Sequence, residues 1–184
     1  MKVLVIGGTG FISGEIVRLT REAGHHLTLF NRGKAVSNPD IPTIFGDVDD
    51  LVSFKDQLVA LNPEIVVHCI CSTQKTSRDL VEVFKGQETR LLVLSSLDCY
   101  DLFQKTVRDH EIYGFPVSEN GPLGSIQYYY RGLTKNPERD TYDKNLMTSV
   151  LLSASNEGNI VKPTIFRCPM VFGPKDPQYL SRHG

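Results

Sequence analysis

A glycine-rich turn follows the first apolar run of the chain. The apolar residues 3–6 lead directly into the stretch 7–14, which reads GGTGFISG. Glycines let the main chain turn tightly, and their missing side chains leave room for a pyrophosphate to contact main-chain N–H groups. A helix after such a turn directs the positive end of its dipole toward the phosphates. The pattern predicts a dinucleotide-binding turn; the alternative is that the glycines serve only the geometry of a strand–turn–helix connection.

Basic residues follow the predicted strand over 26–31. That strand ends at Asn31, and Arg32 and Lys34 come next, with no acid at this position. A carboxylate here selects NAD, because it binds the adenosine ribose and repels a 2′-phosphate, whereas an arginine accommodates that phosphate. Charge-assisted hydrogen bonds contribute about 1.5–3 kcal/mol, which is roughly ten- to hundredfold in affinity. We therefore predict that NADP is preferred over NAD; the alternative is a solvated loop arginine.

An acidic residue follows the predicted strand over 43–45. Asp47 and Val48 stand at the edge of the sheet where the adenine of a bound dinucleotide would lie. A carboxylate accepts a hydrogen bond from the adenine amino group, and a valine covers the ring. The alternative, which is compatible with the first, is that Asp47 or Asp49 caps the helix that starts near residue 50.

Two serines come at the end of the predicted strand over 91–95. Ser95 and Ser96 stand where ligands bind in open α/β sheets. A hydroxyl at this edge can hydrogen-bond a substrate carbonyl or alcohol. The alternative is that these serines only terminate the strand.

The four cysteines predict neither a disulfide framework nor a metal site. Cys69 and Cys71 are two residues apart on one predicted strand, with His68 beside them, so they are expected to share a face. No second ligand pair stands at a plausible spacing for a metal. We therefore expect buried, reduced thiols here and at Cys99 and Cys168, and no bound metal.

Alternating strands and helices must position these residues. Strands are predicted over 2–7, 26–31, 43–45, 65–70, 91–95 and 164–166. Helices are predicted over 11–23, 74–86 and 140–155, together with a short helix whose apolar stripe is Leu51, Phe54, Leu58 and Leu61. This alternation is typical of a doubly wound parallel α/β sheet. Residues 101–139 interrupt it with several glycines and prolines, which predicts an extended excursion over the edge of the sheet.

Bulk composition narrows the class of protein. With 184 residues and 40% apolar content, the chain is expected to form one domain over 1–184. A formal net charge of −1 indicates no general attraction to nucleic acid or an anionic membrane. Met1 leads directly into the first strand and no apolar stretch is long enough to cross a bilayer, so we expect a cytoplasmic protein.

Together these features resemble the NAD-dependent epimerase/dehydratase family of the extended short-chain dehydrogenase/reductase superfamily. The matching motifs are GGTGFI at 7–12, Gly46-Asp47, Ser95-Ser96 with Tyr100 four residues after Ser96, and RCPMVFGP at 167–174. The stretches LFNRGK at 29–34 and YDK at 142–144 resemble a subgroup similar to plastid stem-loop RNA-binding proteins. The resemblance covers nearly the whole chain. It implies a Rossmann fold, NADP or NAD as cofactor, and a sugar-nucleotide-like or other alcohol substrate.

The resemblance also implies catalytic roles. In this family a tyrosinate is the base, a lysine lowers the pKa of that tyrosine, and a serine orients the substrate. These roles fall on Tyr142, Lys144 and Ser96, and Lys144 is also expected to hold the nicotinamide ribose. The expected cofactor contacts are Gly7, Thr9, Gly10, Phe11, Ile12, Asn31, Arg32, Lys34, Asp47, Val48, Cys69, Ile70, Lys144, Pro169 and Val171.

The chain departs from the family at the tyrosine–lysine pair. The family spaces the two residues by four, which places them on one face of a helix. Tyr142 and Lys144 are two apart, so on a regular helix they would point in nearly opposite directions. Either the helix starts later than predicted or the acid–base pair is broken. Tyr142 as a packing residue is the alternative, and Tyr100 or a tyrosine of the run 128–130 is a further candidate phenol.

Two other departures concern packing and length. Ser13 stands where the family has the third glycine of the turn, and we expect a slight adjustment rather than loss of cofactor binding. The sequence stops soon after the last predicted strand, so the substrate-binding lobe of the family is expected to be largely missing. A crevice with one wall excludes water and orients a substrate poorly.

Three functions are therefore considered. The first is a cytoplasmic NADP-dependent oxidoreductase or epimerase that acts on a small molecule. The second is a non-catalytic NADP(H) sensor. The third is RNA binding, which rests on the plastid resemblance and is opposed by the near-neutral charge. The sequence does not define the substrate or the oligomeric state.

Overall fold

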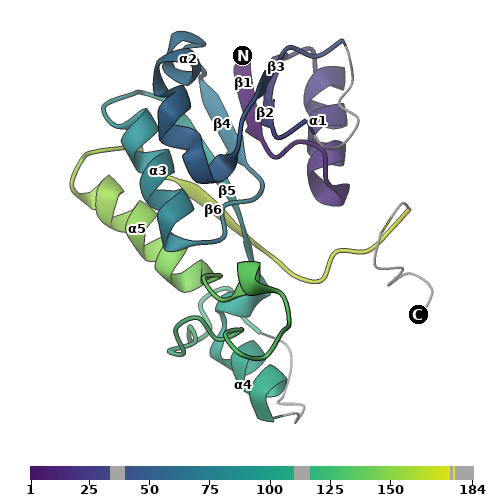
Figure 1. Ribbon diagram of the computed structural model, residues 1–184, viewed down its shortest axis with the longest axis vertical. Helices are drawn as coiled ribbons and strands as arrows, with labels where there is room; N and C mark the ends of the chain where they lie inside the picture. Colours follow the sequence, from purple (N-terminus) through teal and green to yellow (C-terminus); the bar gives the residue numbers. More distant parts are fainter. Residues whose placement is uncertain (34–39, 110–116, 175, 177–184) are drawn as a thin grey trace.

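Among the described residues, six parallel strands form one sheet (Figure 1). The computed structural model describes residues 1–33, 40–109, 117–174 and 176. The strands are β1 (Lys2–Ile6), β2 (His26–Asn31), β3 (Thr43–Phe45), β4 (Ile65–His68), β5 (Arg90–Ser96) and β6 (Thr164–Cys168). They are hydrogen-bonded in the order β3-β2-β1-β4-β5-β6, and every neighbouring pair is parallel. The predicted doubly wound parallel sheet is confirmed.

The strand order reverses between β1 and β4. From β1 the chain winds outward through β2 to β3, and it then crosses back to β4 and winds the other way to β6. Connections that leave the carboxyl ends of β1 and β4 therefore diverge, and a crevice forms between them. The glycine-rich turn that follows β1 lies at this point.

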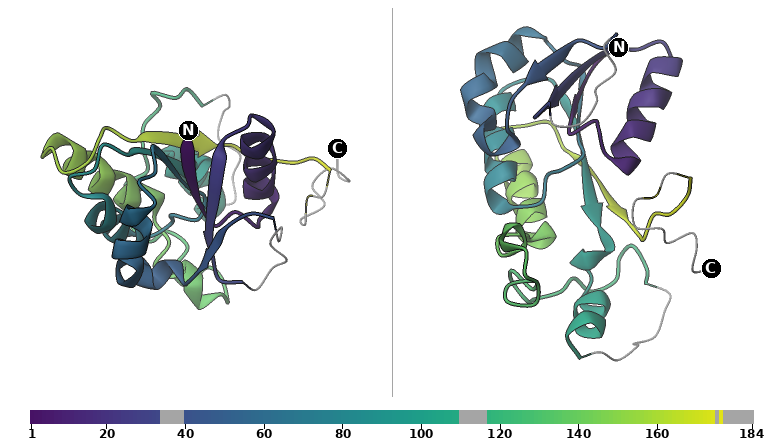
Figure 2. Two further views of the ribbon diagram at one scale, coloured as in Figure 1. Left: turned by 90° about the horizontal axis from the view of Figure 1, so that it is seen from above. Right: turned by 45° about the vertical axis from the view of Figure 1, so that its right-hand side comes forward.

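Helices cover both faces of the sheet (Figures 1 and 2). One face carries α1 (Phe11–Glu22), and the other carries η1 (Val48–Phe54), α2 (Lys55–Ala60), α3 (Gln74–Phe84) and α5 (Lys144–Asn156). Successive strand side chains point to opposite faces. Leu4 and Ile6 of β1 therefore enter the large core with α3 and α5, whereas Val3 and Val5 enter the smaller core with α1. Burial on both faces explains why β1 reads as an unbroken apolar run.

The end of β4 differs from the prediction. The strand ends at His68, so Cys69 and Cys71 lie beyond it, and the prediction that they share a strand face is wrong. The Cys69 N–H still donates to Ile6 O (2.9 Å), but the chain then turns toward α3. Thr73 caps that helix by accepting from the Thr76 N–H (3.1 Å).

The segment 101–139 contains a helix that the sequence analysis did not predict. α4 (Asp101–Asp109) follows the short turn η2 (Leu97–Cys99), and Figure 1 shows it beyond the carboxyl end of β5. Gln104 of α4 is buried; its amide donates to Asp98 O (3.2 Å) and accepts from the Ile126 N–H (3.3 Å). These contacts bind the helix to the loop that follows. The prediction of an extended excursion is therefore wrong for 101–109, and residues 110–116 lie outside the described residues.

The helix that carries Lys144 also begins later than predicted. The short turn η3 (Pro137–Arg139) precedes it, and α5 starts at Lys144 rather than near residue 140. Asp143 caps the helix, because its carboxylate accepts from the N–H groups of Asn145 (3.0 Å) and Leu146 (2.9 Å). The same carboxylate accepts from the Tyr128 N–H (2.9 Å), so the cap also holds the loop.

In the part of the chain that the structure describes, no helix has the length and apolar character needed to cross a membrane.

Candidate active site

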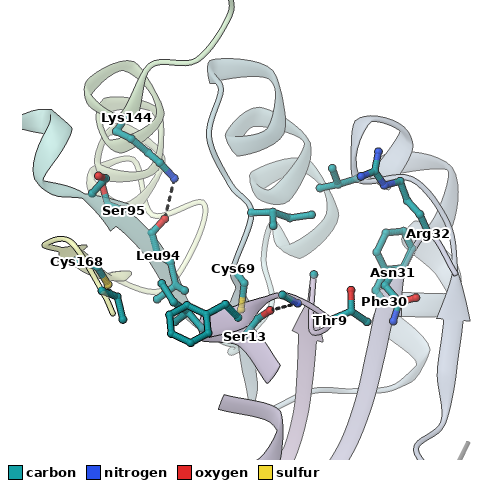
Figure 3. A pocket seen from close by; sticks show the side chains of 18 of the residues that line it. Thr9, Ser13, Phe30, Asn31, Arg32, Cys69, Leu94, Ser95, Lys144 and Cys168 are labelled. Atoms are coloured by element: carbon teal, nitrogen blue, oxygen red, sulfur yellow. Dashed lines mark hydrogen bonds between the residues drawn. The ribbon is translucent and has the colours of Figure 1, made fainter. Parts of the chain in front are cut away.

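A cleft of about 700 Å³ lies at the carboxyl ends of the strands (Figure 3). This volume is typical of sites that hold a small molecule or cofactor. Its lining comes from the glycine turn, the end of β2, the segments after β4 and β6, the end of β5 and the start of α5. The predicted site residues that line it are Gly7, Thr9, Gly10, Phe11, Ile12, Asn31, Arg32, Val48, Cys69, Ile70, Ser96, Tyr142, Lys144, Pro169 and Val171. Asp47 is outside this lining, and Lys34 lies outside the described residues.

The glycine turn has a backbone that requires glycine. Gly7 has φ +82°, in the left-handed region, and a Cβ at this position would lie 2.9 Å from the side chain of Ile70. The turn therefore passes close beneath Ile70 with no space for a side chain. Ser13 is buried, and its hydroxyl accepts from the Gly10 N–H (2.8 Å), so the serine closes the turn with a local hydrogen bond (Figure 3).

The end of β2 places the side-chain amide of Asn31 beside the cationic Arg32. Asn31 is buried, and its Oδ1 accepts from the Gly33 N–H (3.0 Å). Its Nδ2 is buried and has no hydrogen-bond partner among the described residues. Arg32 is exposed and lines the cleft (Figure 3). A buried donor without a partner is rare in proteins, so this end of the cleft fits a ligand that supplies oxygen acceptors.

Asp47 and Val48 have separate roles. The Asp47 carboxylate accepts from the Asp49 N–H (3.1 Å) and caps η1, so the predicted capping alternative is confirmed for Asp47. Val48 lines the cleft. The contact of Asp47 with adenine stays a prediction.

Lys144 is anchored inside the site by main-chain carbonyl groups. It is buried, and its ammonium donates to Cys71 O (2.5 Å) and Leu94 O (3.0 Å; Figure 3). Burial lowers the pKa of the Lys144 ammonium. The two carbonyls belong to the segment after β4 and to β5, so the ammonium joins these segments at the floor of the cleft.

Tyr142 lies outside the helix, which resolves the spacing problem. It forms an antiparallel bridge with Thr73 two residues before α5 begins. Both Tyr142 and Lys144 line the cleft, and the Lys144 Nζ is 5.6 Å from the centre of the tyrosine ring. The later helix start, the first of the two predicted explanations, is confirmed, and the action of the two residues as an acid–base pair stays a prediction. The helical argument fails because only Lys144 has helical geometry.

The Tyr142 hydroxyl donates to Asp98 Oδ2 at 2.8 Å. Burial raises the pKa of the Tyr142 phenol above its ordinary value, and the Asp98 charge raises it further. This arrangement holds Tyr142 as a neutral phenol, unlike the tyrosinate that the family resemblance implied.

Ser96 both ends β5 and lines the cleft. β5 ends at this residue, and its hydroxyl accepts from the Asp98 N–H (3.4 Å) as the cap of η2. The same hydroxyl donates to Asp98 Oδ1 (2.6 Å). Strand termination and a place in the site are therefore compatible.

Asp98 is the residue that sequence reasoning missed. It is buried and accepts hydrogen bonds from Ser96, Tyr142 and Tyr130, the last at 3.3 Å. The available signal was its position two residues after the serine at the end of β5, where the carboxyl edge of the sheet places ligand-binding groups.

The other candidate phenols have packing contacts. Tyr100 donates to Glu119 O (3.1 Å) and accepts from Arg167 (3.4 Å), away from the cleft lining. Tyr129 is buried against Tyr130, with ring centres 4.1 Å apart. The packing interpretation of the tyrosine run fits these contacts, although the Tyr130 hydroxyl reaches Asp98.

The four cysteines are free thiols. Cys71 and Cys99 are buried as predicted, whereas Cys69 and Cys168 are partly exposed, so the prediction of burial is wrong for these two. Burial raises the pKa of the Cys69 thiol to about 12 and that of the Cys71 thiol to about 11. Within the described ranges, no group of three or more His, Cys, Asp or Glu side chains could hold a metal ion.

The strand order, the glycine turn at its reversal and the cleft along the carboxyl ends define a Rossmann-type α/β protein. Residues 3–183 match the model of the NAD-dependent epimerase/dehydratase family, and the chain belongs to this family. No curated protein sequence matches the chain.

Solved structures of larger proteins share the fold. WbmH from Bordetella bronchiseptica, solved with NAD+, is 18% identical with a TM-score of 0.70, over 99% of this chain and 62% of that one. The UDP-glucose 4-epimerase of Thermotoga maritima, solved with UDP-glucose, is 18% identical with a TM-score of 0.68, over 97% and 59%. The dTDP-glucose 4,6-dehydratase of Bacillus anthracis, solved with NAD, is 15% identical with a TM-score of 0.67, over 95% and 56%. The chain thus spans between 56% and 62% of these three structures.

Proposed function

We propose that this chain binds NADP, in preference to NAD, and catalyses oxidation and reduction of an alcohol carbon in a sugar-nucleotide-like substrate. The observation that carries the proposal is the continuous lining of one cleft by the glycine turn, the end of β2 and the group Ser96, Tyr142 and Lys144. The family of the chain agrees with it.

The residues of the cleft fit a dinucleotide. The glycine turn would hold the pyrophosphate, Asn31 and Arg32 the adenosine side, and Cys69, Ile70, Pro169 and Val171 the nicotinamide side. The left-handed backbone of the turn at Gly7 (φ +82°) and the Asn31 Nδ2, which has no hydrogen-bond partner among the described residues, both support this assignment. When bound, the cofactor supplies a nicotinamide ring that accepts or donates a hydride.

The preference for NADP is based on Arg32. Arg32 directly follows β2, where a 2′-phosphate would lie, and no acid stands at the end of this strand. The substrate class is inferred from the structural neighbours, two of which are named for UDP-glucose and dTDP-glucose. Ser96 would orient the substrate oxygen, and Lys144 would contact the nicotinamide ribose.

Fluorescence titration with NADPH and NADH tests the binding. We expect the wild type to bind NADPH more tightly, and Arg32→Ala to weaken NADPH binding by roughly ten- to hundredfold with little effect on NADH. Arg90→Ala is the matched control, because Arg90 is an exposed arginine at the amino end of β5. Equal affinities of the wild type for the two dinucleotides would contradict the NADP preference, and binding of neither would contradict the proposed cofactor.

Two alternatives give different results in the same assays. A protein that binds NADPH but leaves UDP-glucose and dTDP-glucose unchanged is a non-catalytic sensor, a role that the neutral Tyr142 phenol favours. Salt-dependent retention of labelled RNA would favour the RNA-binding alternative, which is opposed by the net charge of −1. The single-domain organisation over 1–184 and the cytoplasmic location belong to the same proposal.

A further inference from the structure

A buried carboxylate lies behind the two hydroxyls of the cleft. Ser96 and Tyr142 line the cleft, whereas Asp98 does not. Each of its carboxylate oxygens accepts from one of them, Oδ1 from Ser96 at 2.6 Å and Oδ2 from Tyr142 at 2.8 Å. A proton that passes from the cleft to Asp98 can therefore travel through a hydroxyl that already points at the carboxylate.

Hydroxyl groups rather than a cation hold the Asp98 carboxylate. Tyr130 is the third donor, at 3.3 Å, and Asp98 takes part in none of the ion pairs found among the described residues. The Lys144 ammonium is directed at two main-chain carbonyls. Hydrogen bonds from hydroxyl groups to a carboxylate are stronger than those between neutral groups, so the two short bonds from Ser96 and Tyr142 and the longer one from Tyr130 stabilise a buried negative charge.

The surroundings of the Tyr142 ring include charges of both signs. Lys144 Nζ is 5.6 Å from the ring centre and the Arg139 guanidinium carbon is 5.7 Å from it, and both favour a phenolate. Burial and the adjacent Asp98 carboxylate oppose a phenolate, and they are the stronger influences, because the Tyr142 pKa is raised. The Ser96 hydroxyl has a smaller effect that lowers the Tyr142 pKa. The rings of Tyr129 and Tyr130 also lie beside the Tyr142 ring, at 6.5 Å and 5.3 Å between centres.

We propose that Asp98 is the proton acceptor of this site, with Tyr142 as the hydroxyl that relays the proton from the substrate. The inference rests on the proposed function, because it concerns the proton released when an alcohol is oxidised. The substrate O–H proton moves to Tyr142 Oη while the Tyr142 proton moves to Asp98 Oδ2. Oxidation of the alcohol to a carbonyl also needs an acceptor for the carbon-bound hydrogen and its electron pair, which an oxidised nicotinamide dinucleotide held in the cleft would supply. The reverse sequence reduces the carbonyl, with Asp98 returning the proton.

The proposal is tested without cofactor or substrate by measuring the ionisation of Tyr142. The full chain is labelled with carbon-13 at tyrosine Cζ, and the Tyr142 resonance is assigned as the one lost in Tyr142→Phe. We expect the wild-type resonance to remain that of a phenol through the pH range in which exposed tyrosines ionise. Asp98→Asn should lower the midpoint of Tyr142 ionisation by about one pH unit or more, because the adjacent charge is removed.

Two further variants separate this coupling from a structural effect. Asp98→Glu retains a carboxylate and should keep the high midpoint of the wild type. Asp143→Asn is the matched control, because Asp143 is another buried carboxylate near the tyrosines that contacts main-chain N–H groups and no hydroxyl of the cleft. It should leave the Tyr142 midpoint unchanged.

The outcomes are distinct. A lowered midpoint in Asp98→Asn, restored in Asp98→Glu, supports the relay. A wild-type Tyr142 that is a phenolate at neutral pH, or a midpoint that Asp98→Asn does not move, overturns it. Failure of the chain to bind NADPH or NADH would contradict the proposed function and would leave these resonances as they are, so the two failures are distinguishable.

Discussion

The cleft has two ends that differ in how they are built. At the dinucleotide end, formed by the glycine turn and the end of β2, the hydrogen bonds join residues close together in the sequence. At the far end, formed by Ser96, Tyr142 and Lys144, they join distant segments. The Gly10–Ser13 hydrogen bond spans three residues and the Asn31–Gly33 hydrogen bond spans two. The Tyr142–Asp98 hydrogen bond spans 44 residues, and that from Lys144 to Cys71 O spans 73. The first end therefore depends on the conformation of short peptides, and the second depends on correct packing of the loop 117–143 and α5 against β5.

The largest effect that we expect is from a substitution at the far end, Asp98→Asn, which should lower the turnover of substrate without weakening NADPH binding. With UDP-glucose as test substrate, Asp98→Asn should lower kcat by about 100-fold or more, the range of a general acid–base contribution. The affinity for NADPH should stay that of the wild type, because Asp98 lies outside the cleft lining. Steady-state kinetics and fluorescence titration check the two parts. A parallel loss of binding would show that the two ends are not separable.

His68 lies in the middle of the sheet, and its burial should make the stability of the protein depend on pH. It is fully buried on β4, paired with Ile6 of β1 and Val93 of β5. Burial lowers its pKa from the ordinary value of 6.5 to about 3, with a smaller effect from Lys144. Between these values the unfolded chain binds a proton that the folded chain does not, so stability falls as pH falls.

From pH 7 to pH 4.5, His68 should remove about 2–3 kcal/mol from the free energy of unfolding. Urea unfolding at both pH values measures this loss. His68→Leu should lose less stability over the same interval, by about that amount, since leucine does not titrate. An equal loss in both proteins would contradict a neutral, buried His68.

A substitution in the glycine turn should weaken NADPH binding without disturbing Ser96, Tyr142 and Lys144 at the far end of the cleft. Gly7→Ala introduces a side chain at φ +82° and against Ile70. The added methyl group should displace the turn from Ile70 and weaken its contacts with the pyrophosphate, and the loss of about 1.5–3 kcal/mol in such hydrogen bonds should raise the Kd for NADPH by roughly ten- to hundredfold.

Gly24→Ala is the matched control for this variant. Gly24 has φ +74°, and a Cβ there meets nothing within 4 Å. It should lose stability from strain while retaining NADPH affinity. Equal losses of affinity in the two variants would show that strain alone, and not the floor of the cleft, governs binding.

The smallest expected effect is a loss of stability when Asp143, the cap of α5, is replaced. Asp143→Ala removes the acceptor for Asn145, Leu146 and Tyr128 and should lower stability by about 1 kcal/mol. Asp143→Asn keeps a good cap and should lie close to the wild type. Thermal melts of the three proteins measure the difference. An Asn variant as unstable as the Ala variant would show that the charge, rather than the cap, matters.

The positions of most strands and the place of the glycine turn were predictable because their signals are local. The bounds of β2 and β3 match the prediction, and the glycine turn was recognised from consecutive residues. The start of α5 was not predictable, because Asp140 and Asp143 both suit a cap and the choice between them is made by contacts such as Asp143 with the Tyr128 N–H. α4 was missed for a similar reason, since the bonds of Gln104 to Asp98 and Ile126 form only in the folded loop.

In the candidate site, too, residues with a local sequence signal were predicted and those that depend on the folded loop were not. Ser96, Tyr142 and Lys144 were named from the family resemblance, and all three line the cleft. Asp98 was not named, because its importance comes from hydrogen bonds with residues 32 and 44 positions later in the chain. A carboxylate two residues past a strand is common in sequences, and only the folded loop makes it a shared acceptor.

The position of Tyr142 before the first turn of α5 has a consequence for recognising related proteins. A phenol placed by an extended segment is freed from helical pitch, so its separation from the lysine along the chain can vary while both groups still meet the same cavity. Pattern searches that require the lysine four positions after the tyrosine would pass over such proteins.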